Sequence, residues 1–131
     1  MNEHSYIRSI HRHLAPDVYV WKINDRYAGG VADAFYHGPS GDILFVEYKY
    51  NVKLPRRESS YVRPNLSSLQ KEWLTQRQKA GISVAVVLGT PIGGLFLEDF
   101  FLDRTLEEFR QSTLSPREIA KEIGSVLRSN C

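Results

Sequence analysis

The sequence predicts an α/β protein in which helices enclose a mixed β-sheet as a sandwich. Three features of the pattern lead to this fold class: helical and extended hydrophobic periods alternate, a short glycine and proline turn joins two strands, and a helix precedes a fully apolar strand as a parallel crossover requires. The 131 residues hold no internal repeat or linker, so one domain over residues 1–131 is expected.

A helix and three strands open the chain. Glu3, Ile7, Ile10 and Leu14 recur on one helical face, and Pro16 ends that helix. Strands are expected over Val18–Ile23, Val31–Tyr36 and Ile43–Tyr50, with turns over Asp25–Gly30 and Gly38–Gly41. The last two strands are so close in the chain that they form a hairpin.

An irregular segment and a second helix follow the hairpin. Residues 51–64 contain two prolines, several charges and no period, so a mobile loop is expected. Leu66, Leu69 and Trp73 mark the inward face of a helix that Gly81 ends.

The rest of the chain predicts an inner strand and three further elements. Ile82–Leu88 is a nearly continuous apolar run, which is typical of a strand covered on both faces. A further strand is expected over Gly94–Glu98, and two closing helices follow the capping boxes Thr105–Glu108 and Ser115–Glu118.

The composition excludes several classes of protein. With 42% hydrophobic and 24% charged residues, disorder is not expected. Cys131 is the only cysteine and the chain has no long apolar segment, so a cytoplasmic protein without disulfides or membrane contact is expected. The histidines have no metal-ligand spacing and are expected on the surface, and Trp21 and Trp73 are expected in the core.

Three charged residues interrupt the apolar faces of the hairpin. Residues two apart share a strand face, so Glu47 and Lys49 project together, and Asp33 interrupts the neighbouring strand similarly. Two carboxylates suit Mg²⁺ or Mn²⁺, and such a metal with a lysine suits phosphodiester hydrolysis. A structural salt-bridge cluster is the alternative from spacing alone.

These residues resemble a known family. Gly30-Val31-Ala32-Asp33, Glu47-Tyr48-Lys49 and Gln70 resemble the motifs of the PD-(D/E)XK nuclease superfamily, especially its compact Holliday-junction-resolvase and VRR-NUC-like members. The resemblance covers roughly residues 3–88 and implies a restriction-endonuclease-like α/β sandwich with a central mixed sheet flanked by helices. Ala32 replaces the proline of the motif, at a position that shapes the backbone and supplies no ligand.

The resemblance also implies roles for single residues. Asp33 and Glu47 would be metal ligands, the Tyr48 carbonyl would be a third, and Lys49 would be the catalytic lysine. Gln70 matches a helix glutamine that helps to assemble the site, although it also completes a capping box.

Glu3 has two interpretations. Some members of the family add a first-helix glutamate to the metal shell, and Glu3 lies on the inward face of its helix as that role requires. It is equally a first-turn acid that complements the helix dipole.

Basic residues gather after the hairpin. Residues 53–79 include seven basic side chains against two acidic ones, which suits a polyanion, although a solvated loop and helix face give the same excess. The candidates for contacts with a phosphate backbone are Lys53, Arg56, Arg57 and Arg63, with Tyr61 as a stacking surface.

The expected function is therefore a Mg²⁺- or Mn²⁺-dependent DNA endonuclease that acts on branched or structured DNA. One alternative is a nuclease fold that binds DNA, or acts as an adaptor, without cutting. A site-specific restriction-type enzyme is disfavoured because no recognition helix is evident. The resemblance to resolvases implies a homodimer, for which Leu95–Leu102 is a candidate interface.

Overall fold

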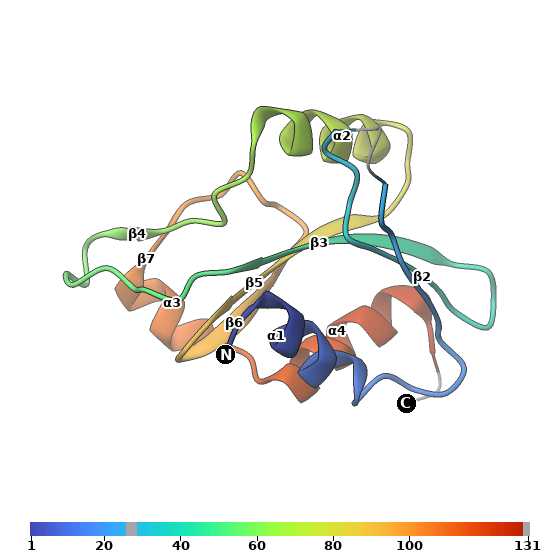
Figure 1. The fold of residues 1–131 in the computed structure, drawn as a ribbon, viewed down its shortest axis with the longest axis horizontal. Coiled ribbons are helices and arrows are strands. Elements are labelled where there is room, and N and C mark those ends of the chain that lie inside the picture. Colours follow the sequence, from blue (N-terminus) through green and yellow to red (C-terminus); the bar gives the residue numbers. More distant parts are fainter. Residues whose placement is uncertain (26–28, 130–131) are drawn as a thin grey trace.

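The computed structural model describes residues 1–25 and 29–129 (Figure 1). The helices are α1 (Glu3–His11), α2 (Ser68–Lys79), α3 (Leu106–Ser112) and α4 (Pro116–Leu127). The strands are β1 (Tyr19–Lys22), β2 (Ala34–His37), β3 (Ile43–Tyr50), β4 (Tyr61–Val62), β5 (Val84–Thr90), β6 (Gly93–Leu97) and β7 (Arg104–Thr105).

Five of these strands form a mixed sheet. Their order is β1-β2-β3-β5-β6, and all neighbours are antiparallel except β3 and β5, which helix α2 connects as a crossover. All seven residues of β5 are buried, as its apolar sequence predicts for an inner strand. The predicted mixed sheet and the predicted hairpin of β2 and β3 are confirmed.

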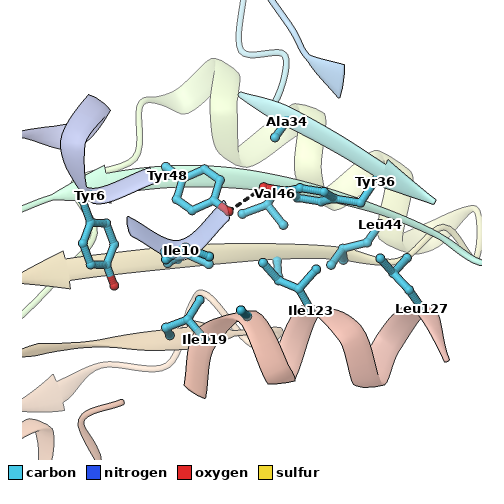
Figure 2. Packing of buried hydrophobic residues seen from close by; sticks show 13 residues of the cluster. Tyr6, Ile10, Ala34, Tyr36, Leu44, Val46, Tyr48, Ile119, Ile123 and Leu127 are labelled. Atoms are coloured by element: carbon cyan, nitrogen blue, oxygen red, sulfur yellow. Dashed lines mark hydrogen bonds between the residues drawn. The ribbon is translucent and has the colours of Figure 1, made fainter. Parts of the chain in front are cut away.

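Alternation along β3 divides the core into two layers. Leu44, Val46 and Tyr48 pack against α1 and α4, together with Ile10 and Ile123 (Figure 2). The opposite side of the sheet packs against α2, whose Leu74 is fully buried among residues of β5 and β6. Helices therefore cover both faces, and the charged side chains of β3 at odd positions point to the α2 side.

Some element boundaries differ from the prediction. Helix α1 ends at His11, and Leu14 packs on the core from the turn beyond it. Strand β2 begins at Ala34, three residues later than expected, and the predicted turn at residues 25–30 lies partly outside the described residues. Strand β5 begins and ends two residues later than Ile82–Leu88. Such shifts arise because a hydrophobic period does not report where backbone pairing stops.

Two predicted burials and one predicted exposure are wrong. Leu69, in the first turn of α2, is 57% exposed, and its side chain lies beside Gly29. Trp21 is 51% exposed because β1 is the edge strand of the sheet. His11 is half-buried instead of lying on the surface, since its imidazole contacts Tyr36 inside the first core layer.

The expected loop at residues 51–64 is partly ordered by pairing. Its strand β4 is antiparallel to β7, and the Leu106 amide donates to the Ser60 carbonyl (2.8 Å). Arg110 Nε donates to Glu58 Oε1 (3.0 Å), so helix α3 anchors the tip of the segment. No helix in the described part of the chain is long and apolar enough to span a bilayer.

Candidate active site

The carboxylates meet at the end of the β2–β3 hairpin. Asp33 lies immediately before β2, and continuing the strand register by one residue sets it opposite Glu47. The Ile23 amide donates to the Asp33 carbonyl (2.9 Å), and the Tyr48 amide donates to Asp33 Oδ2 (2.8 Å). Both the backbone and the side chain of Asp33 are thereby held in place.

Gly30 allows a close approach that assembles the site. Its φ is 83°, a conformation that favours glycine, and a Cβ here would overlap the backbone of Leu69 and Gln70. The segment that leads to Asp33 can therefore pack directly on the first turn of α2. This contact brings the helix residue Gln70 to the carboxylates.

Gln70 performs two structural tasks with one amide. Its Oε1 accepts from the Ser67 amide (2.9 Å), which closes the capping box of α2. Its Nε2 donates to Glu47 Oε2 (3.1 Å). The capping interpretation and the contact with the acidic site hold together, because an amide side chain has both a donor and an acceptor.

Glu47 is a buried carboxylate with an open oxygen. Its side chain is 3% exposed, and Oε1 has no hydrogen-bond partner among the described residues. Burial, followed by the negative charge of Asp33, raises the pKa of Glu47 to about 9, while Lys49 acts in the opposite direction. The protein thus keeps an acid where its ionised form is strongly disfavoured.

The Tyr48 carbonyl faces the same edge as Asp33. Phe45 donates its amide to Ser83 and Asn51 donates its amide to Gly89, so odd-numbered residues of β3 direct their backbone groups to β5. Even-numbered residues direct theirs to the β2 side. Tyr48 therefore points both its amide and its carbonyl toward Asp33.

Glu3 belongs to the same electrostatic group. It lies in the first turn of α1, where Asn2 and Ser5 already form the capping box. Partial burial and the charge of Asp33 raise the pKa of Glu3. Glu3 and Asp33 also line one cavity of about 210 Å³ between α1 and the sheet.

The donor set suits a hard divalent cation. Asp33, Glu47 and the Tyr48 carbonyl offer oxygen atoms only, and Glu47 Oε1, which has no hydrogen-bond partner among the described residues, could donate to a metal ion. Within residues 1–25 and 29–129, no three acidic, histidine or cysteine side chains already stand at metal-binding distances. A metal here would therefore rest on two carboxylates and the carbonyl, with water or phosphate oxygens completing its shell.

A purely structural salt bridge accounts poorly for these charges. Lys49 Nζ lies 3.9 Å from Glu47 Oε2, and Lys49 is only 25% exposed. Its ammonium lowers the pKa of both glutamates, yet both remain raised. One ammonium faces three neighbouring carboxyl groups, so ionising all three would leave a net negative charge that a bound cation would compensate.

Comparisons with known proteins agree with this fold. No family model and no curated protein matches the sequence. Among solved structures, the chain is similar to Hjc of Archaeoglobus fulgidus, a Holliday junction resolvase from an archaeal hyperthermophile. The TM-score is 0.54 and the sequence identity 17%, over 90% of this chain and 99% of that one. The fold is restriction-endonuclease-like.

The basic candidates divide into two groups. Lys53, Arg56 and Arg57 are exposed on the segment between β3 and β4. Arg63 instead makes two hydrogen bonds to the Asp103 carboxylate, both 2.9 Å, and its guanidinium covers the ring of Tyr61 at 4.6 Å. The charge of Arg63 is thus already paired, and one face of the Tyr61 ring is occupied.

A buried polar chain behind the site was not predicted from the sequence. Tyr48 Oη and Tyr36 Oη lie 2.6 Å apart, as the dashed line in Figure 2 marks, and His11 Nε2 lies 2.7 Å from Tyr36 Oη. Burial and the charge of Lys22 lower the pKa of His11 to about 4. These hydrogen-bonded side chains connect α1 to Tyr48, the residue between Glu47 and Lys49. Tyrosines at even positions beside an E-x-K motif are the only signal that the sequence offers.

The candidate dimer segment is mostly core. Leu95, Leu97 and Phe100 are buried in the layer that α2 covers, whereas Phe101 and Leu102 are 58% and 56% exposed. The predicted interface at Leu95–Leu102 is therefore reduced to these last two side chains.

Proposed function

We propose that this protein is a divalent-metal-dependent endonuclease that hydrolyses phosphodiester bonds in branched or otherwise structured DNA. The observation that carries the proposal is the buried Glu47, which lies beside Asp33, Lys49 and Gln70 and keeps one oxygen free. A carboxylate with a pKa near 9 lowers stability whenever it ionises, and such groups concentrate at functional sites. The similarity to a Holliday junction resolvase supports DNA with branches as the substrate class.

The residues have separate tasks in this mechanism. Asp33 and Glu47, with the Tyr48 carbonyl, would hold Mg²⁺ or Mn²⁺. Such a metal would polarise the scissile phosphate and lower the pKa of its bound water. Lys49 orients the attacking water and offsets the charge that develops on the phosphoryl oxygens. Gln70 fixes one oxygen of Glu47 by a hydrogen bond, which would leave the other oxygen for the cation.

The neighbouring groups complete the proposed site. Glu3 adds a carboxylate from α1, which lines one cavity together with Asp33. Lys53, Arg56 and Arg57 would contact phosphates that flank the cut. A homodimer would present two such sites to the two strands of a junction, and the exposed Phe101 and Leu102 suit that contact.

The deciding experiment combines a substrate panel with one matched pair of variants. Labelled duplex, single strand, flap and four-way junction are incubated with Mg²⁺, Mn²⁺ or EDTA. Cleavage should require metal and should favour a branched substrate. Lys49→Ala should abolish most cleavage while DNA affinity stays within a few fold, because its interaction belongs mainly to the transition state. Lys121→Ala, which removes an exposed lysine on α4, should change neither.

The contrary outcomes are equally specific. Cleavage that persists in EDTA, from protein free of contaminating nuclease, would falsify the metal mechanism. DNA binding without cleavage of any substrate would indicate a nuclease fold that only binds DNA.

A further inference from the structure

A row of aromatic rings crosses the edge of the sheet on the α2 side. Tyr19 and His37 stack with centroids 4.8 Å apart and an interplanar angle of 14°. One step along the strands, Trp21 meets Phe35 edge-on at 6.1 Å. We call these four residues of β1 and β2 the aromatic surface.

The aromatic surface is open to solvent. Tyr19 and Trp21 are 52% and 51% exposed, so α2 does not cover the rings on the edge strand. Large aromatic side chains normally bury most of their area, and two neighbouring rings that are half exposed are typical of an interaction site. A bound partner would bury these rings.

The strand register makes this surface contiguous with the candidate active site. Trp21 pairs with Phe35, Phe35 pairs with Phe45, and Glu47 lies two residues after Phe45 on the same face of β3. Two residues along a strand span about 7 Å. The row that contains Trp21 and Phe35 therefore lies one step from the row that contains Asp33 and Glu47.

A positive charge lies at the inner end of the row. The ring centroids of Phe35 and Phe45 lie 5.1 Å apart, and those of Phe45 and Trp73 of α2 also lie 5.1 Å apart. The guanidinium of Arg77 covers the Trp73 ring at 4.7 Å. A nucleic acid suits such a surface, because its flat bases can stack on the aromatic rings and its phosphates can pair with the arginine.

We propose that the aromatic surface binds unpaired bases of the DNA substrate beside the cut, by stacking them on Tyr19 and Trp21. The inference rests on the proposed nuclease function, which brings DNA to the adjacent carboxylates. In a duplex, neighbouring base pairs already cover both faces of each base, whereas bases at a branch point or in a single strand offer a free face. The surface therefore favours DNA with unpaired nucleotides next to the cleaved bond. A second copy of the chain seated here would restrict the approach of DNA to the carboxylates.

The first test measures binding without chemistry. Fluorescence anisotropy in EDTA compares a short oligothymidylate with a blunt duplex for wild type, Trp21→Ala and Trp21→Phe. Loss of one stacked base should weaken binding of the single strand to Trp21→Ala by about 5- to 150-fold. Duplex affinity should not change, and Trp21→Phe should recover most of the loss. Ile92→Ala, which removes an exposed apolar side chain from the turn between β5 and β6, is the control.

A second measurement observes the ring itself. The chain has 2 tryptophans, so Trp73→Phe leaves Trp21 as the only one, and oligothymidylate should quench its fluorescence. Circular dichroism melts check that each variant is folded.

Three outcomes would overturn the inference. They are no binding of oligothymidylate by wild type, wild-type affinity in Trp21→Ala, and conversion of a dimer to a monomer by Trp21→Ala with unchanged affinity per protomer. The last would make the surface an interface between copies. Because binding in EDTA needs neither metal nor cleavage, failure here leaves the nuclease proposal standing. Absence of cleavage, conversely, does not remove binding that depends on Trp21.

Discussion

Replacing Glu47 by glutamine should stabilise the metal-free protein at alkaline pH. The carboxyl group is 3% exposed, and its pKa is raised from 4.5 to about 9 by burial and by Asp33. The folded state therefore holds the proton more tightly than the unfolded state, so this group stabilises the fold fully below pH 4.5. That contribution is lost as the pH rises toward 9. An amide keeps the shape of the protonated acid and does not ionise.

The magnitude follows from the width of this interval. One unit of pKa corresponds to about 1.4 kcal/mol, and pH 5 and pH 8 both lie between the unfolded and folded pKa values. The stability of Glu47→Gln relative to wild type should thus increase by about 4 kcal/mol from pH 5 to pH 8. Metal should narrow this difference at pH 8, since Mn²⁺ at 100 times its Kd stabilises a protein that binds it by about 2.7 kcal/mol and the glutamine variant should bind it poorly.

Urea unfolding in EDTA, followed by circular dichroism at pH 5 and pH 8, measures the change in relative stability with pH. The same experiment with Mn²⁺ measures the stabilisation by metal. Glu122→Gln makes the same chemical change at an exposed site on α4 and should match wild type in both experiments. If the difference between wild type and Glu47→Gln changes by less than about 1 kcal/mol between the two pH values, the reasoning from burial is refuted. Equal stabilisation of both proteins by Mn²⁺ would remove Glu47 from the metal site.

Two further variants test the surroundings of Glu47. Gln70→Glu keeps the capping acceptor of α2 but replaces the donor to Glu47 by a negative charge, which raises the pKa of Glu47 further. Calorimetry should therefore show weaker Mn²⁺ binding with greater proton release on binding, and the helix content should be like that of wild type. Unchanged Mn²⁺ affinity would mean that the amide only caps the helix. Replacing Arg56 and Arg57 by alanine should flatten the salt dependence of DNA binding by about one unit of slope per lost phosphate contact. Arg117→Ala on α4 is the control, and the same slope in all three proteins would show that the segment does not touch DNA.

The sequence was sufficient wherever the signal is local. The eight-residue strand Ile43–Tyr50 and both capping boxes at Thr105 and Ser115 lie as predicted, because alternation and N-cap chemistry act over a few residues. The adjacency of Asp33 and Glu47 followed from the hairpin alone, since a short turn fixes the register of its two strands.

Contacts between distant segments were decided only by the tertiary structure. Which face of α2 is buried depends on how the helix docks on the sheet: Leu69, which the pattern placed on the inward face, is exposed, whereas Leu74 is fully buried. The exposure of Trp21 depends on its strand lying at the edge, which no residue of that strand specifies. The double role of Gln70 needs Gly30 to bring α2 to the hairpin. Periodicity reports that a side chain prefers burial, but the position of its partner depends on packing between elements that are far apart in the chain.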